Sequence, residues 1–166
     1  MNGDRKILEK IVSQVLSGKG AHAEAESVFE GLDWKLTGIH QDGAEHSIFQ
    51  LLNHMIYWQE WAMKWLDGEE AAIPERAAGS WPGSLAPANQ EDWERAVGRF
   101  KAGVDELTAQ SREGDIFSMR LSVGTEKSRL EMLHTIGSHN SYHLGQVVIL
   151  RQMLGAWPPP SGGLTW

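Results

Sequence analysis

Apolar side chains recur at the three- and four-residue spacing of an α-helix along four long stretches of this 166-residue chain. The alternation typical of a half-buried strand is limited to one short segment, Phe117 to Val123, which we expect to be extended. The pattern therefore predicts an all-α fold. The length suits a single domain over residues 1–166 with a core of its own.

Turn residues set the expected limits of the helices. The first helix begins near Asp4 and is bent or interrupted by residues 17–20, and a further helical stretch runs from about Ala21 to Gly31. The other long helices are expected at about Glu45 to Leu66, Asn89 to Gln110, and Ser128 to Leu154. Asn89 and Ser128 are suitable N-caps because Asp92 and Glu131 follow them by three residues.

Two segments are predicted to be non-helical. The connection from Glu69 to Ala88 contains three prolines and Trp81, and it is long for a compact bundle. The tail from Trp157 to Trp166 contains three consecutive prolines and cannot be helical. We expect the tail to be a strap packed over the bundle end by Trp157 and Trp166. Either segment is a candidate for the mouth of a binding pocket.

Composition excludes several function classes. The chain has no cysteine, so it has no disulfide framework, cysteine-based metal site or thiol nucleophile. Its net charge of -7 argues against nucleic acid as a partner. The segment from Met1 to Lys6 leads into an amphipathic pattern rather than a signal peptide, and no apolar run approaches membrane-spanning length. We expect a cytoplasmic protein that binds neither nucleic acid nor membrane.

His139 and His143 point most clearly to chemistry. Four residues of α-helix advance about 6 Å and turn about 40° beyond one revolution, so both imidazoles leave the same face one turn apart. A helix offers two nitrogens to one metal ion in this way. A third candidate, His54, lies on the apolar side of the second long helix, on a face shared with Leu51, Trp58, Trp61 and Trp65.

The last helix is expected to bury one broad stripe, which includes both histidines of the pair. The stripe comprises Met132, Ile136, His139, His143, Gln146, Val147, Leu150 and Leu154. His134 lies nearly opposite and is excluded from the site. Three histidines therefore point inward from two helices that can face each other.

Two interpretations of these histidines remain open at this point. A single buried histidine is more often a core residue bonded to a carbonyl than a metal ligand. Three buried histidines need partners, because burial without one is costly, and the nearby Gln50 and Gln146 cannot satisfy all three. A shared cation would satisfy all three at once.

Four segments carry a family resemblance. They are Gly20-Ala21-His22-Ala23, the segment from His46 to His54, the segment from His139 to Gln146, and the segment from Leu150 to Pro158. In these segments the chain resembles the DinB/YfiT-like superfamily of bacterial four-helix proteins, which are often described as metal-dependent hydrolases. The resemblance spans nearly the whole chain.

The resemblance implies a four-helix bundle, commonly dimeric, with one divalent metal ion held by three histidines. The family ligands fall on His54, His139 and His143, which are the three residues that the helical faces select. The family often has Glu before the second-helix histidine, where this chain has Asn53. Because Asn53 is expected to point away from the metal face, this departure should not affect the ligands themselves. It affects only a residue that would support the ligands or lie at an interface.

Such a site would have restricted chemistry. Three neutral imidazoles leave a coordination position open, which is typical of catalytic zinc rather than structural zinc. The zincin pattern His-Glu-x-x-His is absent, because Asn140 stands where the general-base Glu would be. No carboxylate lies on either metal-facing stripe, so an acid or base would come from a loop, from Tyr57 or Tyr142, or from metal-bound water. Zinc and nickel both suit imidazole ligands.

Two function classes follow. The first is an enzyme, a metal-dependent hydrolase or a thiol-S-transferase acting on a small molecule, since the family includes enzymes that attach low-molecular-weight thiols to small electrophiles. The second is a non-catalytic metal- or small-molecule-binding module of a stress response. His22 and His46 are expected to be local capping or packing residues. We also expect a homodimer, because Phe49 and Leu52 lie opposite the His54 stripe and a lone bundle would expose them.

Overall fold

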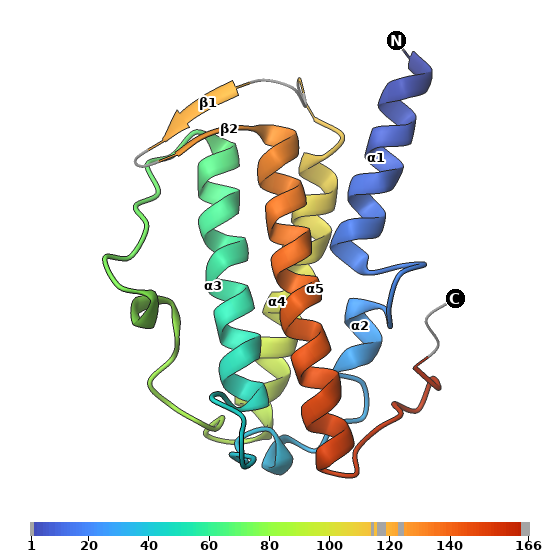
Figure 1. Ribbon diagram of the computed structural model, residues 1–166, viewed down its shortest axis with the longest axis vertical. Coiled ribbons are helices and arrows are strands. Elements are labelled where there is room, and N and C mark those ends of the chain that lie inside the picture. Colours follow the sequence, from blue (N-terminus) through green and yellow to red (C-terminus); the bar gives the residue numbers. More distant parts are fainter. Residues whose placement is uncertain (1, 114, 116–118, 123–124, 164–166) are drawn as a thin grey trace.

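The computed structural model describes residues 2–113, 115, 119–122 and 125–163. Four long helices run side by side, as the sequence predicts (Figure 1). They are α1 (Asn2–Ser17), α3 (Ile48–Asp67), α4 (Gln90–Gln110) and α5 (Arg129–Met153). The helices α1 and α3 each pack against both α4 and α5, which closes a four-helix bundle. No helix among the described residues is long and apolar enough to cross a membrane.

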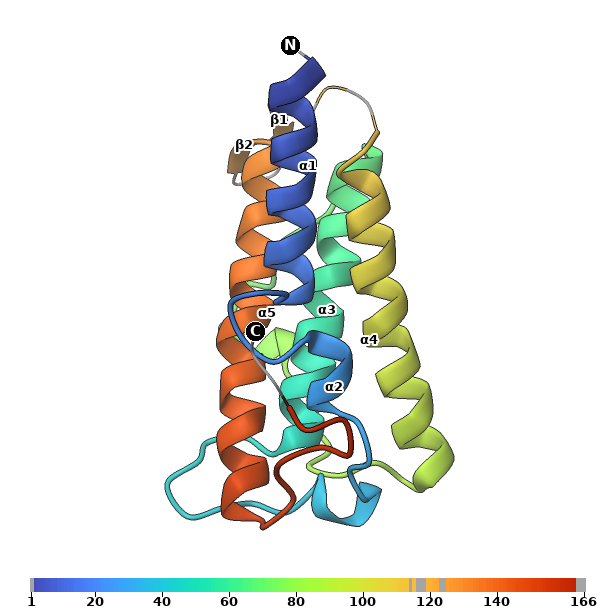
Figure 2. The same cartoon turned by 90° about the vertical axis from the view of Figure 1, so that its right-hand side faces the viewer.

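The stretch expected to be helical from Ala21 to Gly31 is mostly not helical. Only α2 (Ala25–Val28) forms there, because Gly20 and Gly31 adopt φ values of 82° and 64°, which an α-helix does not accommodate. The short α2 lies beyond the end of α1 along the same side of the bundle (Figure 2). Together α1 and α2 therefore cover the length that one long helix would otherwise cover.

Side-chain caps fix the limits of the long helices. Asn89 accepts a hydrogen bond from the backbone N–H of Asp92, and Ser128 forms a capping box with Glu131, as predicted. The helix expected from Glu45 instead begins at Ile48, because Ser47 and Gln50 form a capping box of their own.

The segment between α4 and α5 contains a short hairpin. Its strands β1 (Met119–Ser122) and β2 (Thr125–Ser128) pair antiparallel, with Ser122 opposite Thr125. The predicted extended segment from Phe117 to Val123 thus contains a strand, although Phe117, Ser118 and Val123 lie outside the described residues. Two short 3₁₀ helices, η1 (Trp34–Leu36) and η2 (Ala77–Ser80), lie in the other connections.

The core extends further around α3 and α5 than single helical stripes indicate. Phe49 and Leu52 are 7% and 0% exposed, so the expectation that a lone bundle would expose them was wrong. The helix α3 packs on α4 as well as α5, which leaves little of its circumference to solvent. The helix α5 also buries Leu144 and Asn140 outside the predicted stripe, since it packs on both α1 and α3.

A close helix contact and a buried arginine hold the α1–α2 side of the bundle. A Cβ added to Gly137 of α5 would collide with the Val15 side chain, so the approach of α1 to α5 depends on this glycine. Arg151 is 1% exposed and donates to the carbonyls of Val28, Glu30 and Ala156. The end of α5 is thereby fixed to the segment after α2.

The described part of the tail also lies on this side. Its Pro160 closely approaches Gly31, and the Ser161 N–H donates to the Glu30 carboxylate at 3.2 Å. The tail is non-helical, as predicted, and the Trp157 ring lies 5.4 Å from the Arg151 guanidinium. Trp166, the other predicted anchor of the strap, lies outside the described residues.

Candidate metal centre

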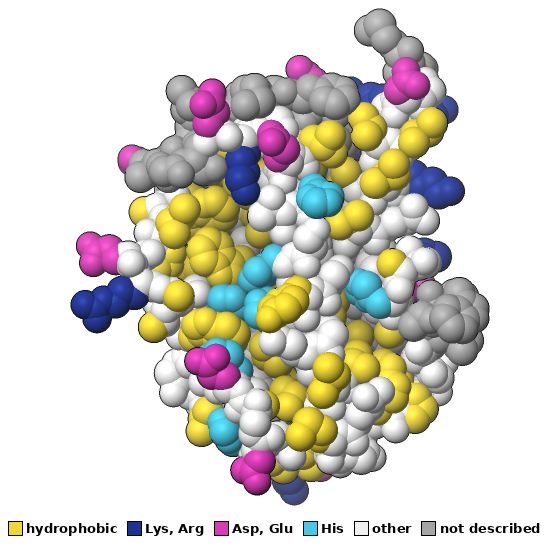
Figure 3. Space-filling model, in the orientation of Figure 1, with side chains coloured by type: hydrophobic (Ala, Val, Ile, Leu, Met, Phe, Trp, Pro, Cys, Tyr) yellow, Lys and Arg dark blue, Asp and Glu magenta, His cyan; other side chains and the backbone are white. Residues whose placement is uncertain are grey.

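The structure brings His54 of α3 together with His139 and His143 of α5. One ring nitrogen from each histidine lies within 4.8 Å of the other two. The closest pair is formed by the Nε2 atoms of His54 and His139, which are 3.2 Å apart. His54 and His143 are buried and His139 is half-buried. Histidine side chains gather in the middle of the face formed by α3 and α5, beside hydrophobic side chains (Figure 3).

Hydrogen bonds select the ring nitrogen that each buried histidine presents to this cluster. The Nδ1 of His54 lies 3.2 Å from the carbonyl oxygen of Ser80, which can only accept, so Nδ1 carries the proton. The Nδ1 of His143 lies 2.6 Å from the amide oxygen of Gln146 and donates to it in the same way. In both neutral rings the lone pair is therefore left on Nε2, the atom needed to bind a metal.

Burial keeps the three imidazoles neutral. It lowers the pKa of His54 and that of His139 to about 4, and it also lowers the pKa of His143. A neighbouring histidine adds to each shift, because two imidazolium charges at this distance repel each other. Neutral imidazole is the form that binds metal ions.

These residues fit a divalent metal ion. Ligand nitrogens at about 2.0–2.1 Å from a tetrahedral zinc ion stand about 3.3 Å apart. The 3.2 Å between the Nε2 atoms of His54 and His139 matches that separation. A single proton shared between these two nitrogens would serve one pair, whereas one cation serves all three rings.

The cluster is bounded on one side by Trp81, from the connection between α3 and α4. Its ring stacks on His54 with centroids 3.8 Å apart and on His46 with centroids 3.5 Å apart. If the imidazoles of His46 and His54 were on the same face of the Trp81 ring at these distances, they would collide. Trp81 therefore lies between the two imidazoles. The sequence analysis named this connection as one of two candidates for the pocket mouth but did not identify Trp81 or Ser80 as contacts of His54.

Side chains of α3 hold this connection in place by donating to its backbone carbonyls. Ser47 donates to Leu85, Gln50 donates to Pro82, and Trp61 donates to Ala71. Together with the contact of His54 to Ser80, these bonds run along one side of α3. The helix that carries His54 thus also positions the residues that orient it.

The remaining contacts of the cluster are aromatic. Trp58 lies edge-on to His54 and His139, at centroid distances of 6.3 and 6.4 Å. Tyr142, which is 66% exposed, has its ring 5.0 Å from that of His143. Within the described part of the chain, none of the hydrogen bonds and ring contacts of the three histidines reaches a carboxylate. Among the residues that the structure describes, a general base of the zincin kind is therefore not in contact with this cluster.

The other histidines of the sequence analysis lie outside the cluster. His22 bonds through Nδ1 to the Ala23 carbonyl and through Nε2 to the Ser141 hydroxyl, so it joins the segment after α1 to α5. His46 packs on Trp81. His134 is exposed, in line with its exclusion from the site.

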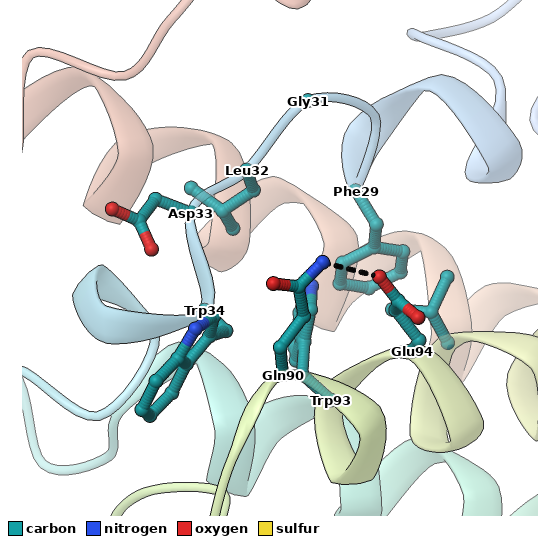
Figure 4. A pocket seen from close by; sticks show the side chains of 9 residues that line it. Phe29, Gly31, Leu32, Asp33, Trp34, Gln90, Trp93 and Glu94 are labelled. Atoms are coloured by element: carbon teal, nitrogen blue, oxygen red, sulfur yellow. Dashed lines mark hydrogen bonds between the residues drawn. The ribbon is translucent and has the colours of Figure 1, made fainter.

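None of the three clustered histidines lines either of two cavities of similar size on the bundle. One, of about 380 Å³, is lined by Trp34 and Trp93, and Gln90 donates to Glu94 beside it (Figure 4). The other, of about 370 Å³, is lined by His46 and Gln146. The described tail lies on the far side of α5 from the 69–88 connection, so it does not line the mouth of the histidine site (Figure 1).

Comparison with known proteins yields one match. The model of a family described as the DinB superfamily matches residues 19–147, a span that includes all three clustered histidines and Gln146. No curated protein and no solved structure matches the chain.

Proposed function

Because this chain belongs to the DinB superfamily, we propose that it is a metal-dependent enzyme that acts on a small molecule, either as a hydrolase or as a thiol-S-transferase. One divalent ion per chain would be held by the Nε2 atoms of His54, His139 and His143. The observation that carries the proposal is the 3.2 Å separation of two of these atoms, from helices facing each other, with the third histidine beside them.

The protein residues define what such a site can do. When bound, the ion would supply Lewis acidity, which lowers the pKa of a water molecule or a thiol. Ser80 and Gln146 hold two of the imidazoles in the metal-binding tautomer. Trp58 and Trp81 place apolar rings in contact with His54, which would suit an apolar or aromatic substrate. Tyr142 bears a hydroxyl on a ring in contact with that of His143 and is a candidate proton donor.

Two finer points belong to the same proposal. Zinc or nickel is the metal we propose, because both accept a set of imidazole ligands. A homodimer is also proposed. Its support is the exposure of Ile7 and Ile11 on α1 and of Ile149 and Met153 on α5, which are each 47% exposed or more.

The test of catalysis uses the metal-loaded protein with small thiols and an aromatic electrophile, and with simple esters and amides. Turnover should vanish in His139→Ala while circular dichroism shows the fold retained. Trp58→Ala should raise KM more than it lowers kcat, because Trp58 contacts the cluster without offering it a ligand atom. Activity that is indifferent to chelation and to His139→Ala would overturn the metal-dependent mechanism.

A second candidate function is a non-catalytic metal- or small-molecule-binding module. The observation that favours it is the lack of a carboxylate in contact with the cluster among the described residues. If the metal-loaded protein turns over none of the thiols, esters and amides, this becomes the better assignment.

A further inference from the structure

A serine and a histidine form a hydrogen-bonded pair outside the histidine cluster. Nε2 of His22, in the segment after α1, lies 2.9 Å from Oγ of Ser141, in α5. Nδ1 of the same imidazole lies 2.8 Å from the carbonyl oxygen of Ala23. A carbonyl oxygen only accepts, so Nδ1 carries the proton of the neutral ring and the lone pair lies on Nε2. The Ser141 hydroxyl therefore donates its proton to a nitrogen base.

Other hydroxyls in the described part of the chain are bonded differently. Ser27, Ser80 and Thr108 each donate to a backbone carbonyl oxygen at 2.8 Å. A carbonyl oxygen holds such a proton in place but does not take it up, whereas an imidazole nitrogen can do so. The bond to His22 thus gives Ser141 a route for losing its proton that these hydroxyls lack.

The backbone around His22 fixes the position of its imidazole. Gly18 has a φ of 80°, and a Cβ added there would collide with the His22 ring. The backbone N–H of His22 donates to the Gly18 carbonyl at 3.1 Å, and the Ala23 carbonyl accepts from Nδ1. A nucleophile within hydrogen-bond reach of a base, with the base oriented by a third group, is the arrangement that activates serine in enzymes.

The pair is open to solvent and separate from the proposed metal centre. His22 and Ser141 are both half-buried, which leaves part of each residue accessible to a small molecule. Two residues of α-helix turn about 200°, so Ser141 leaves α5 on the side opposite to His139 and His143. Chemistry at this pair therefore does not depend on the proposed function.

We propose that Ser141 and His22 form a second active site, which hydrolyses aryl esters of small carboxylic acids. Oγ of Ser141 would bond to the ester carbonyl carbon while its proton moves to Nε2 of His22. The bond from this carbon to the aryl oxygen then breaks, and the leaving oxygen takes the proton from Nε2. Water attacks the acyl-serine in the same way. Nε2 takes the proton of the water and returns it to Oγ, and the carboxylic acid is released.

A fluorophosphonate probe tests the nucleophile in the metal-loaded protein. Oγ of Ser141 should displace fluoride from phosphorus and retain the phosphonyl group, which peptide mass spectrometry locates. Ser141→Ala should remove the labelling at this position. Ser27, which is also half-buried but donates to the Glu24 carbonyl, is the internal control and should stay unlabelled. A chelator should leave the labelling unchanged.

His22→Gln separates a base from a structural contact. An amide can keep the hydrogen bond to Ser141 but cannot take up its proton, so labelling should slow by about 100-fold or more. A packing role, which the sequence analysis expected for His22, would leave the rate unchanged. Circular dichroism checks that the variant is folded.

A thiol introduced at the same position tests the pair in a folded chain with His22 intact. The chain has no cysteine, so Ser141→Cys introduces a single thiol, which His22 should convert in part to the thiolate. At about pH 7, iodoacetamide should alkylate it about tenfold faster than the thiol of the matched variant Ser27→Cys. Equal alkylation rates would contradict activation by His22.

Turnover of p-nitrophenyl acetate in excess chelator distinguishes this site from the metal centre. The wild type should release nitrophenolate, and Ser141→Ala and His22→Gln should fall to the background rate. Turnover that is lost on chelation but kept in Ser141→Ala would support the metal centre and refute the second site. A fluorophosphonate adduct absent from Ser141, or formed equally fast in folded His22→Gln, would also overturn the inference.

Discussion

Trp81 lies flat against His54, with ring centroids 3.8 Å apart and ring planes 5° apart. The two residues come from different elements, since His54 is in α3 and Trp81 follows η2. The same segment supplies the Ser80 carbonyl that faces Nδ1 of His54. The orientation of this imidazole therefore depends on the connection from Glu69 to Ala88, which lacks the helical apolar spacing that the long helices show.

Replacing Trp81 should weaken metal binding without unfolding the bundle. Trp81→Ala removes the stack and frees His54 to turn, and the loss of such a supporting contact typically costs about 10-fold to 100-fold in metal affinity. Trp81→Phe should restore part of the affinity. Competition with a chromophoric chelator measures it, and Trp34→Ala, on η1, is the control. Equal affinities in the wild type and Trp81→Ala would refute a positioning role.

Gln146 should act on His143 in the same way. Its amide oxygen accepts a hydrogen bond from Nδ1 of His143, with 2.6 Å between the two atoms. Gln146→Leu should therefore lower metal affinity by about tenfold or more. Gln146→Glu should preserve the affinity, because a carboxylate accepts the same hydrogen bond more strongly. If the leucine and glutamate variants bind metal equally, the hydrogen bond does not position the ligand.

The metal-free protein should lose stability as the pH falls from about 6.5 to about 4. Burial lowers the pKa of His54 and His139 to about 4, so in this range the unfolded chain takes up protons that the folded chain does not. Each of these histidines contributes a slope of at most about 1.4 kcal/mol per pH unit. At a pH below their pKa in the folded protein, or above their pKa in the unfolded chain, these histidines should contribute nothing to the slope.

Urea unfolding of the metal-free protein at a series of pH values measures this slope. His54→Leu should make it shallower, whereas His134→Leu, at an exposed position, should leave it unchanged. A slope that is the same in the wild type and His54→Leu would contradict the assignment of the titrating group.

The three clustered histidines could be predicted because their placement is mostly local. Four-residue spacing fixes the faces of His139 and His143, and the apolar face of α3 fixes that of His54. The capping pairs Asn89 with Asp92 and Ser128 with Glu131 are local too, and both helix starts were predicted correctly.

The features that sequence reasoning missed depend on contacts between distant segments. Trp81 reaches His54 only because Ser47, Gln50 and Trp61 hold the connection against α3. Phe49 and Leu52 were assigned to an exposed face because a helical wheel does not show how many neighbours a helix has. The capping box of Ser47 and Gln50 was present in the sequence and could have placed the start of α3 correctly.

A dimer remains a prediction, now on different residues. Ile7 and Ile11 are 60% and 47% exposed on α1, and together they offer apolar area that a second copy could cover. Sedimentation velocity at micromolar concentration should show a dimer, and Ile7→Glu/Ile11→Glu should shift it toward monomer. Finding only monomer for the wild type would reject the prediction.

Metal content is the most direct test of the central claim. The purified wild type, analysed by inductively coupled plasma mass spectrometry, should carry about one divalent ion per chain. His54→Ala, His139→Ala and His143→Ala should each lose most of it, because removing one of three ligands breaks the chelate. His134→Ala should keep it. Full metal retention in all three cluster variants would contradict the account.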